Sequence, residues 1–133
     1  MEEGREQPDT PGYQRLAAWQ RAMDLVEAVY ATSRAWPRDE QYGLTGQARR
    51  AAISIPSNLA EGHGRSGRKE YAHHVSIAFG SLCELETQLL IAHRLGYVST
   101  QELEPLLDRI AEARRIILGL LRSLKPATDA ATP

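Results

Sequence analysis

The stretch Y71-AHHVSIAFGSLCELETQLLI-A92 decides the fold of this chain, because its apolar residues recur at alternating steps of four and three. The stripe consists of Tyr71, Val75, Ala78, Leu82, Leu85, Leu89 and Ala92. These steps place the side chains on one face of an α-helix, with the 3.5-residue period of helices that pack lengthwise against each other. We therefore predict a helix over residues 68–95 with one buried face.

A turn and a second helix follow this stretch directly. Gly96 can take the left-handed conformation that commonly ends a helix. In the "STQE" segment, Ser99 and Glu102 predict a capping box, in which each side chain bonds the backbone N–H of the other. The helix that begins there has a stripe with the same steps, formed by Leu103, Leu106, Ile110, Ala113, Ile117, Leu120 and Leu124.

Two more helical segments precede the stretch. The first should end near Ala35, because Pro37 pushes Trp36 out of the helical conformation. We expect its buried face to be the stripe of Leu16, Trp19, Met23, Val26 and Tyr30. The second runs from about Gln41 to Glu61, and its expected core face is formed by Leu44, Ala48, Ala51 or Ala52, Ile55 and Leu59.

Four helical segments with short connections, and no segment with the alternation of a strand, predict an all-α protein. We predict an antiparallel up-down-up-down four-helix bundle over residues 13–125. Pro56 should bend the second helix, because it lacks an N–H and its ring crowds the preceding turn. Residues 1–12 and 126–133 lack apolar periodicity and are predicted to be mobile tails.

The composition of the chain limits which partners and which cellular compartment can be predicted for it. Lys and Arg number 16 against 17 Asp and Glu, so the whole chain has no general attraction to nucleic acid or anionic membranes. The first residues, "MEEGREQPDTPGY", are acidic where a secretory signal would be basic, and no membrane-spanning apolar run is evident. These features, with a single cysteine, predict a cytoplasmic protein without membrane partners.

No catalytic residue, metal site or cofactor is predicted. Glu70 and His73 form one Glu-x-x-His pair, but a di-iron site in a helical bundle needs a second pair and two more carboxylates. Cys83 follows Leu82 on a packed helix, where cysteine usually serves as a small apolar side chain. The glycines of "EGHGRSG" are not preceded by a strand, so the segment is a poor phosphate-binding loop.

Charge is unevenly distributed along the chain. Residues 41–69 hold five cationic residues and one acidic residue, and residues 113–127 hold four and none, whereas residues 83–112 hold six acidic residues and two arginines. A local basic surface predicts RNA or DNA as an alternative partner. Its candidate nucleic-acid-binding residues are Arg49, Arg50, Arg65, Arg68 and Lys69. The same zones could instead pair between subunits of an oligomer.

Several blocks of the chain resemble the 23S rRNA-intervening-sequence protein family of four-helix-bundle proteins. They include "YGL" at 42–44, "RRA" at 49–51, "SIPSN" at 54–58, "AEG" at 60–62, "GSL" at 80–82, "ELET" at 84–87 and "RLGY" at 94–97. Gly67 departs from the pattern, since relatives usually have Ser or Thr there. The resemblance implies a small cytoplasmic bacterial protein whose relatives form pentameric rings and are not known as enzymes. It also implies a relation to accessory proteins of diversity-generating retroelements, which bind reverse transcriptase and nucleic acid.

The sequence therefore predicts a non-enzymatic protein that forms a homo-oligomeric, by resemblance pentameric, ring and acts as a scaffold or adaptor. Apolar residues outside the main stripes, such as Ile77, Leu90 and Ile91, suit a subunit interface. The alternative is a nucleic-acid-binding accessory factor, associated with rRNA or with a reverse transcriptase. We expect the second helix and its turn to be shaped by a structural motif of Ser54, Pro56, Ser57, Asn58 and Gly62.

Overall fold

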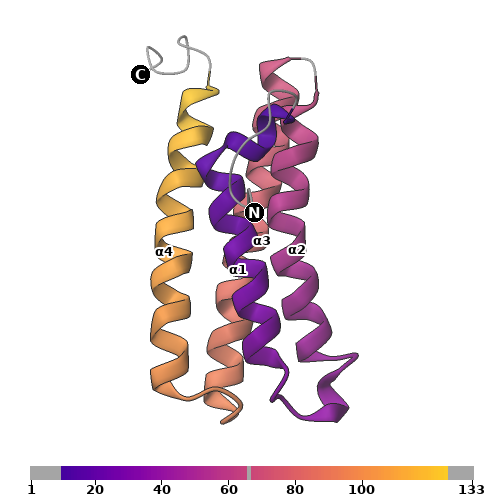
Figure 1. The fold of residues 1–133 in the computed structure, drawn as a ribbon, viewed down its shortest axis with the longest axis vertical. Helices are drawn as coiled ribbons and strands as arrows, with labels where there is room; N and C mark the ends of the chain where they lie inside the picture. The colour runs from indigo at the N-terminus through magenta and orange to yellow at the C-terminus, as the bar shows by residue number, and fades with distance from the viewer. Residues whose placement is uncertain (1–9, 66, 126–133) are drawn as a thin grey trace, which may run out of the picture.

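The computed structural model describes residues 10–65 and 67–125 of the chain. Over this part there are four α-helices and no strand, which confirms the all-α four-helix fold (Figure 1). The helices are α1 (Ala17–Ser33), α2 (Leu44–His63), α3 (Arg68–Arg94) and α4 (Thr100–Ser123). Two short 3-10 helices, η1 (Gly12–Arg15) and η2 (Arg38–Glu40), precede α1 and α2. The predicted tails lie outside the described residues, except for residues 10–12.

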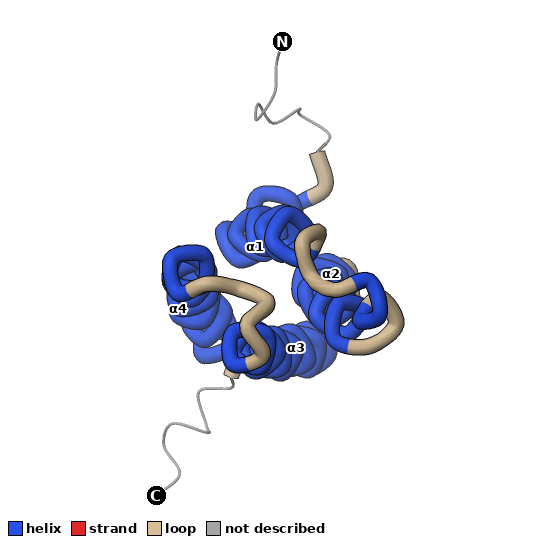
Figure 2. Tube along the Cα trace, turned by 90° about the horizontal axis from the view of Figure 1, so that it is seen from below, coloured by secondary structure: helices blue, strands red, loops and turns tan. Residues whose placement is uncertain are grey.

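Each helix packs against two neighbours, α1 on α2, α2 on α3, α3 on α4 and α4 on α1, and the contact of α2 with α3 is the most extensive. Viewed along the bundle, α1 lies diagonally opposite α3 (Figure 2). The connections from α1 to α2 and from α3 to α4 lie at one end of the bundle (Figure 1). The turn from α2 to α3 lies at the other end, so the surfaces there are built from the end of α2, the start of α3 and the end of α4.

The predicted core faces of α3 and α4 are confirmed. Val75, Ala78, Leu82, Leu85, Leu89 and Ala92 are buried, and so are Leu103, Leu106, Ile110, Ala113 and Ile117. The stripe ends are less enclosed, because Tyr71, Leu120 and Leu124 are partly buried against the core. In α2 the core face is built mostly from small residues, as expected, with Ala48, Ala51, Ala52, Ile55 and Leu59 buried. Small side chains let α2 approach its neighbours closely.

The prediction for the core face of α1 is wrong, because the buried residues lie one position earlier in the chain than the predicted ones. The buried residues are Ala18, Ala22, Leu25, Val29 and Ser33, whereas Met23 is 38% exposed. Trp19 and Val26 pack only partly against the core. Helix α1 is apolar on two adjacent faces, and the face with the smaller residues turns inward, where α1 packs against α2 and α4. The larger side chains therefore lie at the rim of the α1–α2 seam.

The predicted helix ends are confirmed on either side of the α3–α4 connection. Gly96 has a φ of 83°, and the N–H groups of Gly96 and Tyr97 donate to the carbonyls of His93 and Ala92, as in a Schellman motif. Ser99 Oγ accepts from the Glu102 N–H at 3.1 Å, and Glu102 Oε1 accepts from the Ser99 N–H at 2.9 Å. Both halves of the capping box are present.

Helix α2 begins at Leu44, three residues after the predicted start. Here Glu40 Oε1 accepts from the Leu44 N–H at 3.0 Å, so a carboxylate satisfies one of the free amides at the helix start. Helix α2 continues through Pro56. The bend at this proline stays a prediction.

One helix within the described part, α3, is long and apolar enough to cross a membrane by length and composition alone. The sequence analysis expected no membrane-spanning apolar run, whereas α3 passes this test of length and composition. Core helices of water-exposed bundles pass the same test, and the main apolar stripe of α3 is buried inside this bundle.

Candidate functional site

The motif that the sequence singles out in α2 lies at the seam with α3. Ser54 Oγ is hydrogen-bonded to Ser81 Oγ at 2.8 Å, and Asn58 Nδ2 donates to the Ser54 carbonyl at 2.9 Å. His74 Nδ1 lies 3.1 Å from Asn58 Oδ1, within hydrogen-bonding distance. These polar groups satisfy one another between the two helices, which supports a structural function for Ser54 and Asn58.

Gly62 marks the closest approach of α2 to α3. A Cβ added at this glycine would lie 2.6 Å from the Cβ of His74 and 3.2 Å from a ring carbon of Tyr71. No side chain fits at that distance without a shift of the helices. The partners Ser81 and His74 were missed by sequence reasoning, because their pairing depends on how α2 and α3 align.

An open apolar groove lies between α1 and α2. Its volume is about 350 Å³, and it is lined by Tyr13, Trp19, Met23, Val26, Ile53, Pro56, Ser57 and Ala60. Tyr13 packs edge-on against Trp19, with ring centroids 5.6 Å apart. The groove thus contains the apolar stripe of α1 that does not enter the core, together with two motif residues, Pro56 and Ser57.

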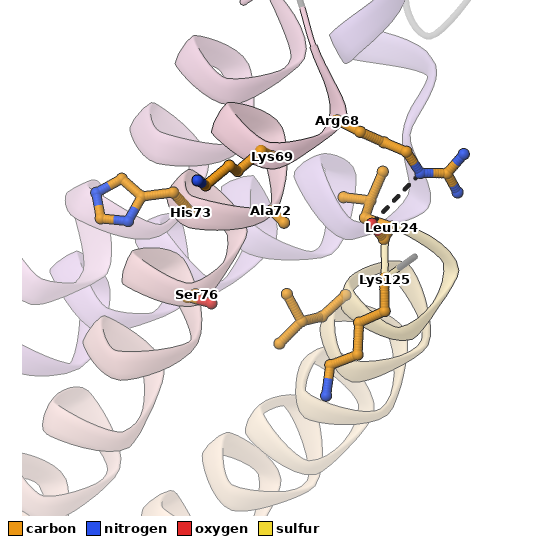
Figure 3. A pocket seen from close by; sticks show the side chains of 8 residues that line it. Arg68, Lys69, Ala72, His73, Ser76, Leu124 and Lys125 are labelled. Carbon is orange, nitrogen blue, oxygen red and sulfur yellow. Dashed lines mark hydrogen bonds between the residues drawn. The ribbon is translucent and has the colours of Figure 1, made fainter. Parts of the chain in front are cut away.

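A larger, basic cavity of about 600 Å³ lies between the start of α3 and the end of α4 (Figure 3). It is lined by Arg68, Lys69, Ala72, His73, Ser76, Leu121, Leu124 and Lys125. Lys69 and His73 extend from the α3 side and Lys125 from the α4 side (Figure 3). The lining has cationic groups around an apolar floor and contains no carboxylate, so it suits an anionic group attached to an apolar or planar body.

The predicted nucleic-acid-binding residues fall into two groups along the bundle. Arg49 and Arg50 lie in the first half of α2, and Arg65, Arg68 and Lys69 lie at its far end and beyond. About 15 residues of helix separate the groups, which corresponds to roughly 22 Å. Sequence reasoning missed Lys125, which lines the same cavity as Lys69.

Three of these five cations are already engaged within the chain. Arg49 Nε donates to Ser33 Oγ at 2.9 Å, and its guanidinium lies 4.5 Å above the ring of Tyr30. Arg68 donates to the carbonyls of Leu124, at 3.3 Å, and Ser123, and so compensates the negative end of the α4 dipole (Figure 3).

The third engaged cation is Arg65, whose guanidinium is 2.7 Å from Glu61 Oε2, one helical turn earlier. This hydrogen bond lowers the pKa of Glu61, which the charge of His74 lowers further, and it raises the pKa of Arg65. Lys69 and Arg50 have no ion pair within the described part of the chain.

The chain is similar to known proteins in sequence and in fold. A family model described as 23S rRNA-intervening sequence protein matches residues 14–119. The fold is similar to the crystal structure of a protein of unknown function from the S23 ribosomal protein family of Bacteroides thetaiotaomicron. The two chains are 17% identical with a TM-score of 0.71, and the likeness covers 79% of this chain and 95% of the other. The search of curated proteins gave no match.

Proposed function

The chain belongs to the 23S rRNA-intervening sequence protein family, and from this premise we propose that it is a non-enzymatic subunit of a homo-oligomeric ring that serves as a scaffold or adaptor. The observation that carries the proposal is the apolar groove between α1 and α2. Met23 and Ile53 are 38% and 41% exposed in this groove, and Trp19 and Val26 beside them are only partly buried against the core. Apolar residues that gather in an exposed groove are suited to an interface with another chain.

A second apolar surface supports a ring. Ile91 and Leu95 are 42% and 54% exposed and lie one turn apart at the end of α3. Ile77, which is 39% exposed, lies on the same side but roughly 21 Å earlier, with the exposed Glu84 between. Helices α1 and α3 lie diagonally across the bundle (Figure 2). Two different apolar patches on different sides of a subunit suit head-to-tail contacts, which close into a ring when the rotation between subunits allows it. We propose five subunits, as the resemblance to ring-forming relatives implies.

Assembly is tested by light scattering on the full-length protein after size-exclusion chromatography, at micromolar concentration. We expect a mass of five subunits for the wild type. Met23→Glu and Ile53→Glu place a charge in the groove, and they should shift the mass toward the monomer. Ala31→Glu adds the same charge at an exposed position of α1 outside the groove, and it should leave the mass unchanged.

A monomeric wild-type protein would refute the ring. An oligomer that both groove variants leave intact would show that the subunits meet elsewhere.

The basic cavity in Figure 3 favours a second candidate function, a nucleic-acid-binding accessory factor. Lys69 and Lys125 flank the cavity, and the neighbouring start of α3 adds the positive end of a helix dipole. Phosphates of RNA or DNA would bind at the two lysines, and a base would lie against Leu121 and Leu124. Arg65 and Arg68 would contribute mainly to the local potential, because both already have partners in the fold.

This candidate is tested by fluorescence anisotropy with labelled structured RNA and duplex DNA over a range of salt concentrations. The wild type should bind more weakly as salt rises, and Lys69→Gln with Lys125→Gln should lower the slope of log K against log salt by about 1 per lysine. Arg94→Gln with Arg109→Gln removes the same charge from exposed positions outside the cavity and serves as control. Unchanged anisotropy at low salt would exclude the function.

A further inference from the structure

A small pocket at the connection of α1 and α2 is separate from both surfaces described above. Its volume is about 280 Å³, and it is lined by Ser33, Arg34, Trp36, Pro37, Arg38, Gln41, Thr45 and Arg49. This is at the lower end of the range of roughly 300–1,000 Å³ that is typical of sites for drug-sized ligands. The pocket therefore suits an ion or a very small molecule.

The pocket is strongly cationic. Three of its lining residues, Arg34, Arg38 and Arg49, are arginines, and none is a carboxylic acid. Within residues 10–65 and 67–125 none of the three forms an ion pair. The nearby carboxylate of Glu40 is engaged elsewhere, because it accepts from the Leu44 N–H and the Tyr97 hydroxyl. Three uncompensated guanidinium groups around a small pocket favour an anion.

Arg49 is already positioned for such a ligand. Its Nε donates to Ser33 Oγ at 2.9 Å, and its guanidinium stacks on Tyr30. These contacts fix the plane of the guanidinium group and leave its two terminal nitrogens without a hydrogen bond to any described residue. Terminal N–H groups of a fixed guanidinium can donate to two oxygens of one oxyanion without a further loss of side-chain freedom.

Two buried polar groups in the pocket lining have no partner. Trp36 and Thr45 are only 5% and 6% exposed, yet Trp36 Nε1 and Thr45 Oγ1 make no hydrogen bond. Buried polar atoms are nearly always paired in native proteins. An indole N–H is only a donor, and a hydroxyl can also donate, so each group can bind an acceptor. Thr45 is the second residue of α2, where the helix dipole also favours negative charge.

We infer that this pocket binds a free phosphate-sized oxyanion, with Arg34, Arg38 and Arg49 as its charge partners and Trp36 and Thr45 as neutral donors. The ligand would join the end of α1 to the start of α2. Its binding would therefore stabilise the folded chain by an amount that grows with the logarithm of the ligand concentration once this exceeds the dissociation constant.

The test is thermal unfolding of the full-length protein in inorganic phosphate, with sodium chloride at matched ionic strength as reference. We expect the Tm to rise with phosphate and to change little with chloride. Arg34 and Arg38 are exposed, so Arg34→Gln with Arg38→Gln should keep the fold and weaken the apparent phosphate affinity at least tenfold. Arg50→Gln removes a charge beside Arg49 but outside the pocket, and should leave the response unchanged.

The Thr45→Val variant distinguishes a ligand-binding hydroxyl from one that affects only the stability of the fold. Replacing an unpartnered buried hydroxyl by a methyl group should raise the Tm without phosphate. The same change removes a donor from the ligand, so the phosphate-induced rise in Tm should become smaller. The inference is overturned if phosphate and chloride act alike, if phosphate has no effect, or if the arginine double variant responds as the wild type does.

Discussion

At the scale of single residues, Glu40 connects three segments of the chain. Its carboxylate accepts from the Leu44 N–H at the start of α2 and from the Tyr97 hydroxyl at 2.8 Å, beyond the end of α3. These two hydrogen bonds lower the pKa of Glu40 from its ordinary value of 4.5. The hydrogen bond to the carboxylate also raises the pKa of Tyr97 above its ordinary value of 10.0.

The pKa shift of Glu40 predicts the direction in which stability changes with pH. Since the folded-state pKa of Glu40 is lowered, its contribution to stability is present above pH 4.5 and is lost as the pH falls through the folded-state value. Glu40→Gln should lower the Tm at pH 7 and make the Tm less dependent on pH in the acid range. Glu27→Gln, at an exposed position of α1, is the control. Parallel pH curves for Glu40→Gln and the wild type would contradict this assignment.

The raised pKa of Tyr97 affects stability in the alkaline range. Its neutral phenol donates to Glu40, so this contribution is complete below pH 10.0 and is lost as the pH rises through the folded-state value. The pair is therefore intact across the neutral range, and the connection between α3 and α4 is held to the start of α2 there.

At the scale of helices, the contact of α2 with α3 depends on the absence of a side chain at Gly62. We predict that Gly62→Ala destabilises the protein by about 1–3 kcal/mol, because the added methyl group overlaps His74 and forces the helices apart. Gly119→Ala is the matched control in α4, where an added Cβ has no neighbour within 4 Å. That change should stabilise by about 0.5–1 kcal/mol through helix propensity.

Urea unfolding followed by circular dichroism measures both variants. The two substitutions add the same atoms to a helical glycine, so opposite signs isolate the effect of the interhelical contact. Equal midpoints for Gly62→Ala and Gly119→Ala would mean that the two helices can separate at Gly62 without cost.

At the scale of the whole molecule, folding brings charged residues together that are far apart in the sequence. The start of α3 meets the end of α4, as the hydrogen bond from Arg68 to the Leu124 carbonyl shows, so basic residues from two distant segments gather at one end. Of the six acidic residues of 83–112, two lie in the second half of α3 and four lie in α4, between Glu102 and Glu112. Arg49 and Arg50 lie away from the basic end. A polyanion at the basic end would therefore contact only part of the predicted set.

The apolar surfaces are also arranged at this scale. The α1–α2 groove and the outer face of α3 lie on different sides of one subunit, so neighbouring subunits in a ring could pair them. Neither surface includes the basic cavity or the arginine pocket. Assembly and anion binding can thus be tested by separate variants.

The sequence by itself determined the four helices, the buried stripes of α3 and α4, the Gly96 turn and the Ser99–Glu102 capping box. These features depend on residues within a few positions of one another, so local spacing is sufficient to predict them.

Only the tertiary structure decided which of the two apolar faces of α1 is buried, because that choice depends on the room that α2 and α4 leave. It also placed Lys125 and Lys69 at one cavity, separated Arg49 from Arg65, and left Trp36 and Thr45 unpartnered in a pocket with three arginines. Residues this far apart in the chain become neighbours only through helix packing. Periodicity along a single helix carries no information about such contacts.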